Sequence, residues 1–122
     1  MERKLLLLVD DEEDWTCLLQ GFLSSQGYSV LCASSCLEAL VLVRQHNPRC
    51  VILDLNLGKE NGADLCCLLK SSPECKDMRV IILSGSDDVP RDCRCDAVIC
   101  KADGIDRILA ALKKVLGEDN SL

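Results

Sequence analysis

Five short apolar segments recur along this 122-residue chain, and segments with helical spacing separate most of them. The apolar segments are residues 4–9, 28–32, 50–54, 79–84 and 97–100. Regular alternation of strands and helices favours a parallel sheet whose strands are joined by right-handed helical crossovers. We therefore predict a single α/β domain with a doubly wound, five-stranded parallel sheet.

The helical segments carry apolar residues at i, i+3 and i+4, which is the spacing of one buried face. In the first helix, residues 12–25, we expect this face to contain Trp15, Leu18, Leu19, Phe22 and Leu23. In the third helix, residues 62–70, we expect it to contain Leu65, Leu68 and Leu69. In the last helix we expect it to contain Ile105, Ile108, Leu109, Leu112, Val115 and Leu116.

Capping residues predict where two of the helices begin and end. The second helix opens with Ser35-Cys36-Leu37-Glu38, a capping-box pattern, and should stop before Pro48. The last helix should begin with Asp103 as its N-cap and end with Gly117 at the C′ position.

Polar side chains follow four of the predicted strands, at the point where each strand ends. Asp10 and Asp11 follow the first strand, Asp54 ends the third, and Ser84 and Lys101 end the last two. Because the carboxyl ends of parallel strands meet at one edge of the sheet, where ligands bind, we expect these side chains to lie together. Three carboxylates, a hydroxyl and an ammonium would suit a hard cation beside a phosphoryl group.

From about Lys4 to Leu116, this pattern resembles the receiver domain of two-component response regulators. The resemblance is carried by Val9-Asp10-Asp11, Ile52-Leu53-Asp54-Leu55-Asn56-Leu57, Gly62, Leu83-Ser84-Gly85 and Lys101. It implies a flavodoxin-like receiver fold with strand order 2-1-3-4-5. Residues 1–117 would form the receiver, and residues 118–122 would form a disordered tail.

The resemblance also implies a role for each site residue. Asp54 would be the phosphoacceptor, and a histidine kinase or phosphotransfer protein would be the donor. Mg²⁺ would be bound directly by Asp11 and Asp54, through water by Asp10, and by the backbone carbonyl of Asn56. Lys101 would pair with one phosphoryl oxygen and Ser84 would donate a hydrogen bond to another. A downstream protein partner would then read the phosphorylated state.

Three departures from the family concern this readout. The segment between Ser84 and Lys101 is short and contains Pro90, so we expect the family's fourth helix to be shortened or missing. Ala102 stands where the family has a proline in a cis peptide, and a cis bond there would cost about 2.5–4 kcal/mol. We therefore expect a trans bond and a displaced Lys101. Val98 stands where the family tends to have an aromatic switch residue.

These departures leave three function classes open. The first is a phosphoacceptor receiver that signals by protein–protein contact and does not act as an enzyme on a separate substrate. The second is a receiver-like interaction module whose phosphorylation switching is atypical or lost. The third is a metal-dependent phosphatase with an aspartyl intermediate, which Asn56 disfavours because that class needs a second acid at this position.

The amino-acid composition argues against two classes of binding partner, nucleic acids and membranes. The net charge of −6, the scattered lysines and arginines and only three aromatic residues argue against nucleic-acid binding by this chain alone. No apolar run approaches the roughly 20 residues of a membrane span, and the first is too short for a signal peptide. We expect a cytoplasmic monomer or weak dimer without membrane contact.

The chain contains ten cysteines, an unusually high number for its length. Seven lie in apolar periodic segments, where thiols behave as small hydrophobic groups: Cys17, Cys32, Cys36, Cys50, Cys66, Cys67 and Cys100. We expect reduced thiols, with Cys93 and Cys95 exposed in a poorly protected segment 86–96. The single histidine, His46, should be a solvated residue at a helix end.

Overall fold

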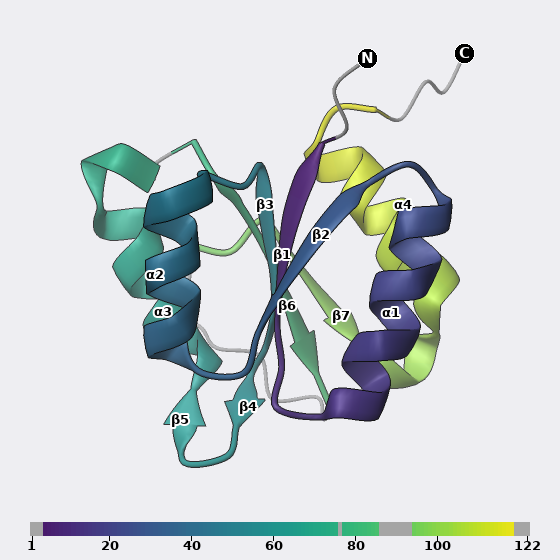
Figure 1. Ribbon diagram of the computed structural model, residues 1–122, viewed down its shortest axis with the longest axis horizontal. Helices are drawn as coiled ribbons and strands as arrows, with labels where there is room; N and C mark the ends of the chain where they lie inside the picture. The colour runs from purple at the N-terminus through teal and green to yellow at the C-terminus, as the bar shows by residue number, and fades with distance from the viewer. Residues whose placement is uncertain (1–3, 76, 86–93, 119–122) are drawn as a thin grey trace.

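The computed structural model describes residues 4–75, 77–85 and 94–118 (Figure 1). Its centre is a parallel sheet made of β1 (Leu5–Val9), β2 (Ser29–Ala33), β3 (Cys50–Asp54), β6 (Arg79–Ser84) and β7 (Ala97–Cys100). These strands lie in the order β2-β1-β3-β6-β7. Counted along the chain, this is the predicted order 2-1-3-4-5, so the fold prediction is confirmed.

Helices cover both faces of the sheet (Figure 1). One face packs against α1 (Glu13–Ser25) and α4 (Ile105–Val115), and the other against α2 (Cys36–His46) and α3 (Gly62–Ser71). These are the four α-helices of the described residues, and none lies between β6 and β7. This fits the expected shortening of the family's fourth helix, although residues 86–93 of that segment lie outside the described part of the chain.

Shorter elements complete the fold. A two-stranded antiparallel hairpin, β4 (Asn56–Leu57) and β5 (Glu60–Asn61), follows β3 and was not predicted from the sequence. Two 3₁₀ turns lie at Pro73–Cys75 and Lys101–Asp103. No helix of the described residues is long and apolar enough to cross a membrane.

The core has two halves because successive strand residues point to opposite faces of the sheet. On the α2 and α3 side, Leu7, Val51 and Val80 are fully buried. On the α1 and α4 side, Leu6, Ile52 and Ile81 are buried to the same degree. The strands are therefore apolar on both faces, as in other parallel sheets covered by helices.

The predicted buried stripes are wrong at one leucine in each of two helices. Leu18 in α1 is 58% exposed and Leu68 in α3 is 53% exposed. Each precedes another leucine, Leu19 or Leu69, that points into the core. Neighbouring residues are about 100° apart around a helix, so only one leucine of each pair can occupy the centre of the buried face. In the last helix, Ile108 and Leu112 are buried, and the other predicted residues are half-buried.

The helix ends confirm two of the capping predictions and correct a third. Ser35 Oγ accepts a hydrogen bond from the Glu38 amide at 3.2 Å, so Ser35 is the N-cap of α2. Gly117 occupies the C′ position, with its amide bonded to the Lys114 carbonyl. The predicted N-cap Asp103 lies instead in the 3₁₀ turn, and Gly104 caps α4 with a φ of 93°. The reason is that this left-handed backbone suits glycine rather than aspartate.

Glu118 lies outside the predicted receiver boundary but contacts the fold. The Tyr28 hydroxyl donates a hydrogen bond to Glu118 Oε1 at 2.6 Å, and Lys4 Nζ lies 2.7 Å from Oε2. The rest of the predicted tail, residues 119–122, lies outside the described residues. His46 is the last residue of α2 and is exposed, as predicted.

The cysteines only partly follow the prediction. Cys50 and Cys66 are buried like small hydrophobic residues, but Cys17 and Cys67 are exposed. Cys95, predicted to be exposed, is half-buried and packs against the core on the α2 and α3 side. Free thiols occur at Cys17, Cys32, Cys36, Cys50, Cys75 and Cys100. Cys93 lies outside the described residues.

Candidate functional site

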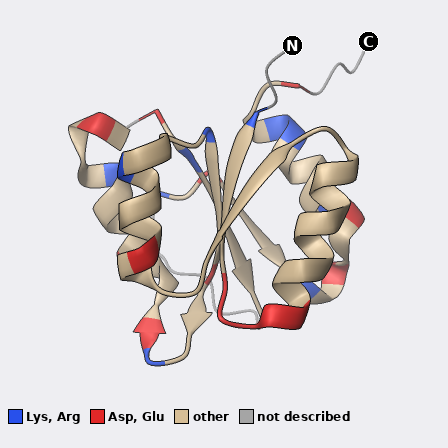
Figure 2. Ribbon diagram, in the orientation of Figure 1, with Lys and Arg blue, Asp and Glu red and all other residues tan. Residues whose placement is uncertain are grey.

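The carboxyl ends of three strands place an acidic pocket at one edge of the sheet. Asp10 follows β1, Asp54 is the last residue of β3, and Lys101 follows β7. The strands are in register there, since Val9 pairs with Leu53 and Asp54 pairs with Leu83. Figure 2 shows that acidic residues colour the turn from β1 into α1 at this edge. The sequence-based grouping of Asp10, Asp54 and Lys101 is therefore present in the folded chain.

Lys101 provides the ammonium of this pocket. Its Nζ lies 2.9 Å from Asp54 Oδ2, 2.9 Å from Asp10 Oδ2 and 3.4 Å from Glu12 Oε1. The expected displacement of Lys101 is thus wrong. The described residues contain no cis peptide bond, and Lys101 is the first residue of a 3₁₀ turn. The trans backbone through Ala102 still directs the ammonium into the pocket.

The two strand-end carboxylates are buried and partly satisfied by nearby backbone amides. Asp10 is 7% exposed and its Oδ1 accepts a hydrogen bond from the Glu12 amide at 2.9 Å. Asp54 is 4% exposed and its Oδ1 accepts from the Asn56 amide at 3.1 Å. Asp10 Oδ2 is within ion-pair distance of Lys101, but it has no hydrogen-bond partner of acceptable geometry among the described residues. One buried acceptor of the pocket therefore lacks a hydrogen-bond donor.

Burial and nearby charges affect the pKa values of Asp10 and Lys101, which form an ion pair, in different ways. Burial raises the pKa of Asp10 above its usual value, and the nearby Asp54 charge adds to this, although the Glu12 amide and Lys101 oppose it. Burial alone would lower the pKa of Lys101, but the hydrogen bond to Asp54 and the charges of Asp54 and Asp10 outweigh it and raise that pKa. Lys101 is therefore charged at neutral pH. Among the described residues it is the one cation within ion-pair distance of Asp10, Glu12 and Asp54.

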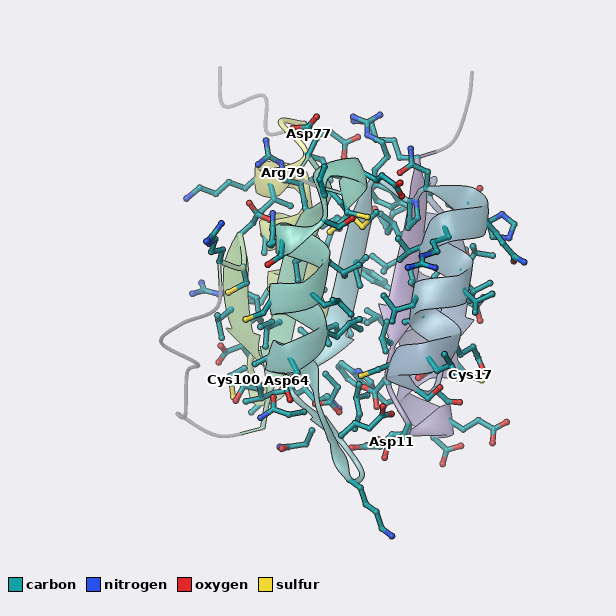
Figure 3. All side chains as sticks on the ribbon, turned by 90° about the vertical axis from the view of Figure 1, so that its left-hand side faces the viewer. Asp11, Cys17, Asp64, Asp77, Arg79 and Cys100 are labelled. Carbon is teal, nitrogen blue, oxygen red and sulfur yellow. The ribbon has the colours of Figure 1, made fainter. Side chains whose placement is uncertain are left out.

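The carboxylates that come together differ from those predicted. Oxygen atoms of Asp10, Glu12 and Asp54 lie within 4.8 Å of one another. Sequence reasoning missed Glu12 because it belongs to the turn after the strand and not to the strand-end pattern. Asp11 is exposed, and its Oδ2 is 3.5 Å from the position that a Cβ on Gly58 would take. Figure 3 shows Asp11 beside the β4–β5 hairpin.

Two other predicted site residues lie at the same edge. Ser84 is the last residue of β6, pairs with Cys100 of β7, and is 1% exposed. Asn56 opens the hairpin and is exposed, with its amide bonded to Asp54. The metal-binding role of the Asn56 carbonyl and the phosphate-binding role of Ser84 stay predictions. Val98, at the position of the family's aromatic switch, is half-buried against the core.

Gly62 allows the hairpin to return the chain beneath Asp54. Its amide donates a hydrogen bond to the Leu55 carbonyl at 2.7 Å. A Cβ at this position would overlap the carbonyl oxygen of Asp54 and crowd the Leu53 side chain. The glycine quoted in the resemblance is thus required by a close backbone approach next to the expected phosphoacceptor.

Trp15, in the first turn of α1, lies beside the pocket. Its ring centroid lies 5.5 Å from Lys101 Nζ, within the range of a cation–π contact. The side chain is half-buried and packs against the core on the α1 and α4 side. Trp15 therefore contacts both the core and the pocket, and its burial is less complete than predicted.

Comparison with known proteins agrees with this geometry. Residues 6–113 match the family model of the response regulator receiver domain. This chain belongs to that family. The polar-differentiation response regulator DivK of Brucella ovis is 28% identical over 120 residues, covering 94% of this chain and 98% of the relative.

Solved receiver structures superimpose closely on this receiver. The chemotaxis response regulator CheY4 of Vibrio cholerae has a TM-score of 0.85 at 18% identity, covering 93% of this chain and 99% of that one. A response regulator from Burkholderia pseudomallei, solved with a phosphorylated aspartic acid, a calcium ion and citrate, has a TM-score of 0.80 at 28% identity. The match to it covers 96% of this chain and 73% of that one.

Proposed function

We propose that this receiver accepts a phosphoryl group on Asp54 from a histidine kinase or phosphotransfer protein and reports it to a downstream protein partner. The observation that carries the proposal is the 2.9 Å contact between Lys101 Nζ and Asp54 Oδ2 in a pocket where Asp54 is 4% exposed. A carboxylate can attack a phosphoryl group and hold it as a mixed anhydride. A fixed ammonium beside it stabilises the charge that develops on the transferred oxygens.

The donor set of the pocket fits Mg²⁺, which prefers oxygen ligands. Within the described part of the chain, Asp10 Oδ2 is a buried acceptor without a hydrogen-bond donor, and three clustered carboxylates face the one ammonium of Lys101. We propose that Asp10, Asp11, Asp54 and the Asn56 carbonyl hold the ion, with Glu12 as an additional carboxylate at the rim. Bound there, Mg²⁺ would offset the repulsion between the carboxylates and an incoming phosphoryl group.

In this proposal the chain's own groups orient the acceptor. The Asn56 amide holds Asp54 Oδ1 and Lys101 holds Oδ2, so the carboxylate has a fixed direction before the donor arrives. Ser84 would donate its hydroxyl hydrogen to a phosphoryl oxygen. The receiver would thus supply the acceptor and the charge stabilisation itself, and it would not act as an enzyme on a separate substrate.

Two further observations support the proposal. The Burkholderia pseudomallei response regulator, 28% identical, was solved with a phosphorylated aspartic acid. The free thiols at Cys17, Cys32, Cys36, Cys50, Cys75 and Cys100 fit the reducing conditions of the cytoplasm, where we propose that the chain resides. The packing of Val98 against the core favours the alternative, a receiver-like interaction module with atypical switching, because this residue has no ring to reorient.

Acetyl phosphate tests the proposed function without a cognate kinase. We expect the wild-type protein with Mg²⁺ to gain the mass of one phosphoryl group, and we expect Asp54→Asn and EDTA each to prevent the gain. Asp103→Asn is the control, because Asp103 is exposed and lies in the turn next to Lys101. Labelling of Asp54→Asn at the wild-type level would contradict the proposal. Binding of a protein partner without any labelling would favour the alternative module.

A further inference from the structure

The surroundings of Lys101 include one contact that is not a carboxylate. Its Nζ approaches Asp10, Glu12 and Asp54, and on a further side it faces the ring of Trp15 at 5.5 Å. The Lys101 side chain is only 18% exposed, so these four groups surround an ammonium that has little access to water. Trp15 is the only tryptophan of a chain with three aromatic residues.

The orientation of the Trp15 ring favours the ammonium over a hydrogen bond of its own. Buried indole N–H groups usually find an acceptor. The Trp15 N–H is buried but has no hydrogen-bond partner among the described residues. The ring instead packs against the core on one side and presents its π-system to Lys101, and tryptophan is the aromatic residue that attracts a cation best.

Cation binding and phosphorylation would change the contacts of Lys101 with the carboxylates but not its contact with the Trp15 ring. This expectation rests on the proposed function. A divalent cation would compete with Lys101 for oxygens of Asp10 and Asp54, and phosphorylation would convert the Asp54 carboxylate into a mixed anhydride. Both changes weaken the contacts that now hold the ammonium. The contact with Trp15 depends on neither change.

The backbone gives Lys101 little other support. β7 is an edge strand with a single neighbour, β6, and Lys101 lies just beyond its end in a short 3₁₀ turn. Ala102 follows, where the family pattern has a ring-constrained proline. The position of the ammonium therefore depends on side-chain contacts, since the lysine stem itself is flexible.

We propose that Trp15 is a positioning residue for Lys101. Its ring face holds the ammonium beside the acceptor oxygen of Asp54 when the carboxylates are engaged by a cation or modified by a phosphoryl group. Trp15 does not touch the reacting atoms, and it acts through Lys101 alone.

Three variants separate this role from simple packing. Trp15→Leu removes the ring, Trp15→Phe keeps a weaker one, and Phe22→Leu is the matched control. Phe22 is an aromatic residue of the same helix, is half-buried, and packs against the same core. With acetyl phosphate and saturating Mg²⁺, we expect Trp15→Leu to slow the labelling of Asp54 by about 2- to 30-fold, the range that cation–π contacts support. Trp15→Phe should recover most of the rate, and Phe22→Leu should keep all of it.

The NMR shift of the Lys101 ε-methylene protons gives a readout that packing alone would not change. We expect these protons to lie upfield in wild type because of the indole ring current, and to stay upfield with Mg²⁺ and beryllofluoride. The shift should disappear in Trp15→Leu and persist in Phe22→Leu. Equal slowing by Trp15→Leu and Phe22→Leu, or loss of the wild-type shift on adding Mg²⁺, would overturn the proposal.

The two readouts also distinguish this inference from the proposed function. If wild type shows the upfield shift but is never labelled on Asp54, the phosphoacceptor proposal fails while the contact between Trp15 and Lys101 stands. If wild type is labelled and all three variants are labelled equally fast, the positioning role fails and the phosphoacceptor proposal stands.

Discussion

Asp96 Oδ2 lies 2.8 Å from Lys70 Nζ, so a residue just before the edge strand β7 is paired with the last turn of α3. The same oxygen accepts a hydrogen bond from the Val80 amide at 2.8 Å, and Arg79 Nη1 lies 3.3 Å from Oδ1. The Asp96 amide in turn donates to the Val80 carbonyl. These contacts fix the point at which the chain enters β7 and therefore the start of the strand that leads to Lys101.

The first prediction is that Asp96→Asn destabilises the protein by about 2 kcal/mol. The substitution removes the negative partner of a lysine whose side chain is only 10% exposed, and hydrogen bonds to charged groups contribute about 1.5–3 kcal/mol. Urea unfolding of the two proteins at pH 7 measures the difference. Asp103→Asn, at an exposed position, should have no comparable effect. A free energy of unfolding within about 0.5 kcal/mol of wild type would show that the Asp96 contacts contribute little.

The second prediction concerns the pH dependence of this difference. Burial opposes ionisation of Asp96, but hydrogen bonds from Lys70 and the Val80 amide outweigh it and lower the pKa. The unfolded carboxyl has a pKa of about 3.9. A lowered folded pKa means that the stabilisation is present above the unfolded value and is lost as the pH falls through the folded one. The stability gap between wild type and Asp96→Asn should therefore be constant from about pH 6 to 7 and narrow below about pH 4. A gap that widens in acid would contradict this assignment.

The third prediction is that Asp10→Asn raises the melting temperature of the protein in metal-free buffer at pH 7. Burial and the Asp54 charge raise the pKa of Asp10. For a raised pKa the favourable contribution is present at low pH and lost as the pH rises through the folded value, so ionised Asp10 lowers stability at neutral pH. Thermal unfolding in EDTA measures the gain. Mg²⁺ should stabilise wild type more than the variant, because the variant lacks one of the proposed carboxylates. A lower melting temperature for Asp10→Asn in EDTA would count against the crowded-carboxylate account.

The fourth prediction compares two glycines. Gly62→Ala should destabilise the protein by about 1–3 kcal/mol, because the new Cβ meets the Asp54 carbonyl and the Leu53 side chain. Gly21→Ala is the control: it lies in α1 and has nothing within 4 Å of its Cβ position, so it should stabilise the helix by about 0.5–1 kcal/mol. Chemical unfolding measures both. Equal effects of the two substitutions would show that the close backbone approach at Gly62 does not require a glycine.

The strands and the residues of the pocket could be predicted from the sequence because both depend on the local order of apolar and polar residues. Apolar runs that end in Asp10, Asp54 and Lys101 specify the strands and the shared edge at once. The expected displacement of Lys101 is wrong because ion pairs with two buried carboxylates determine the position of its ammonium, and the isomer of the next peptide bond does not.

Other features could not be predicted from local pattern. Glu12 joins the pocket through the turn that follows β1, and Asp96 finds Lys70 and Val80 across the sheet edge. Both depend on the packing of segments that are far apart in the chain or outside regular elements. The exposure of Leu18 has the same cause. Only the packing of α1 against the sheet shows that Leu19, and not Leu18, points into the core.

The most direct test of the central claim is to trap the acyl phosphate and locate it. After reaction with acetyl phosphate and Mg²⁺, borohydride reduces an aspartyl phosphate to homoserine, and peptide mass spectrometry identifies the residue. We predict homoserine at position 54 in wild type and in Asp103→Asn, and at no position in wild type treated with EDTA. Homoserine at Asp10 or Asp11 with Asp54 unmodified, or no homoserine in a folded, Mg²⁺-treated protein, would contradict the assignment of Asp54 as the phosphoacceptor.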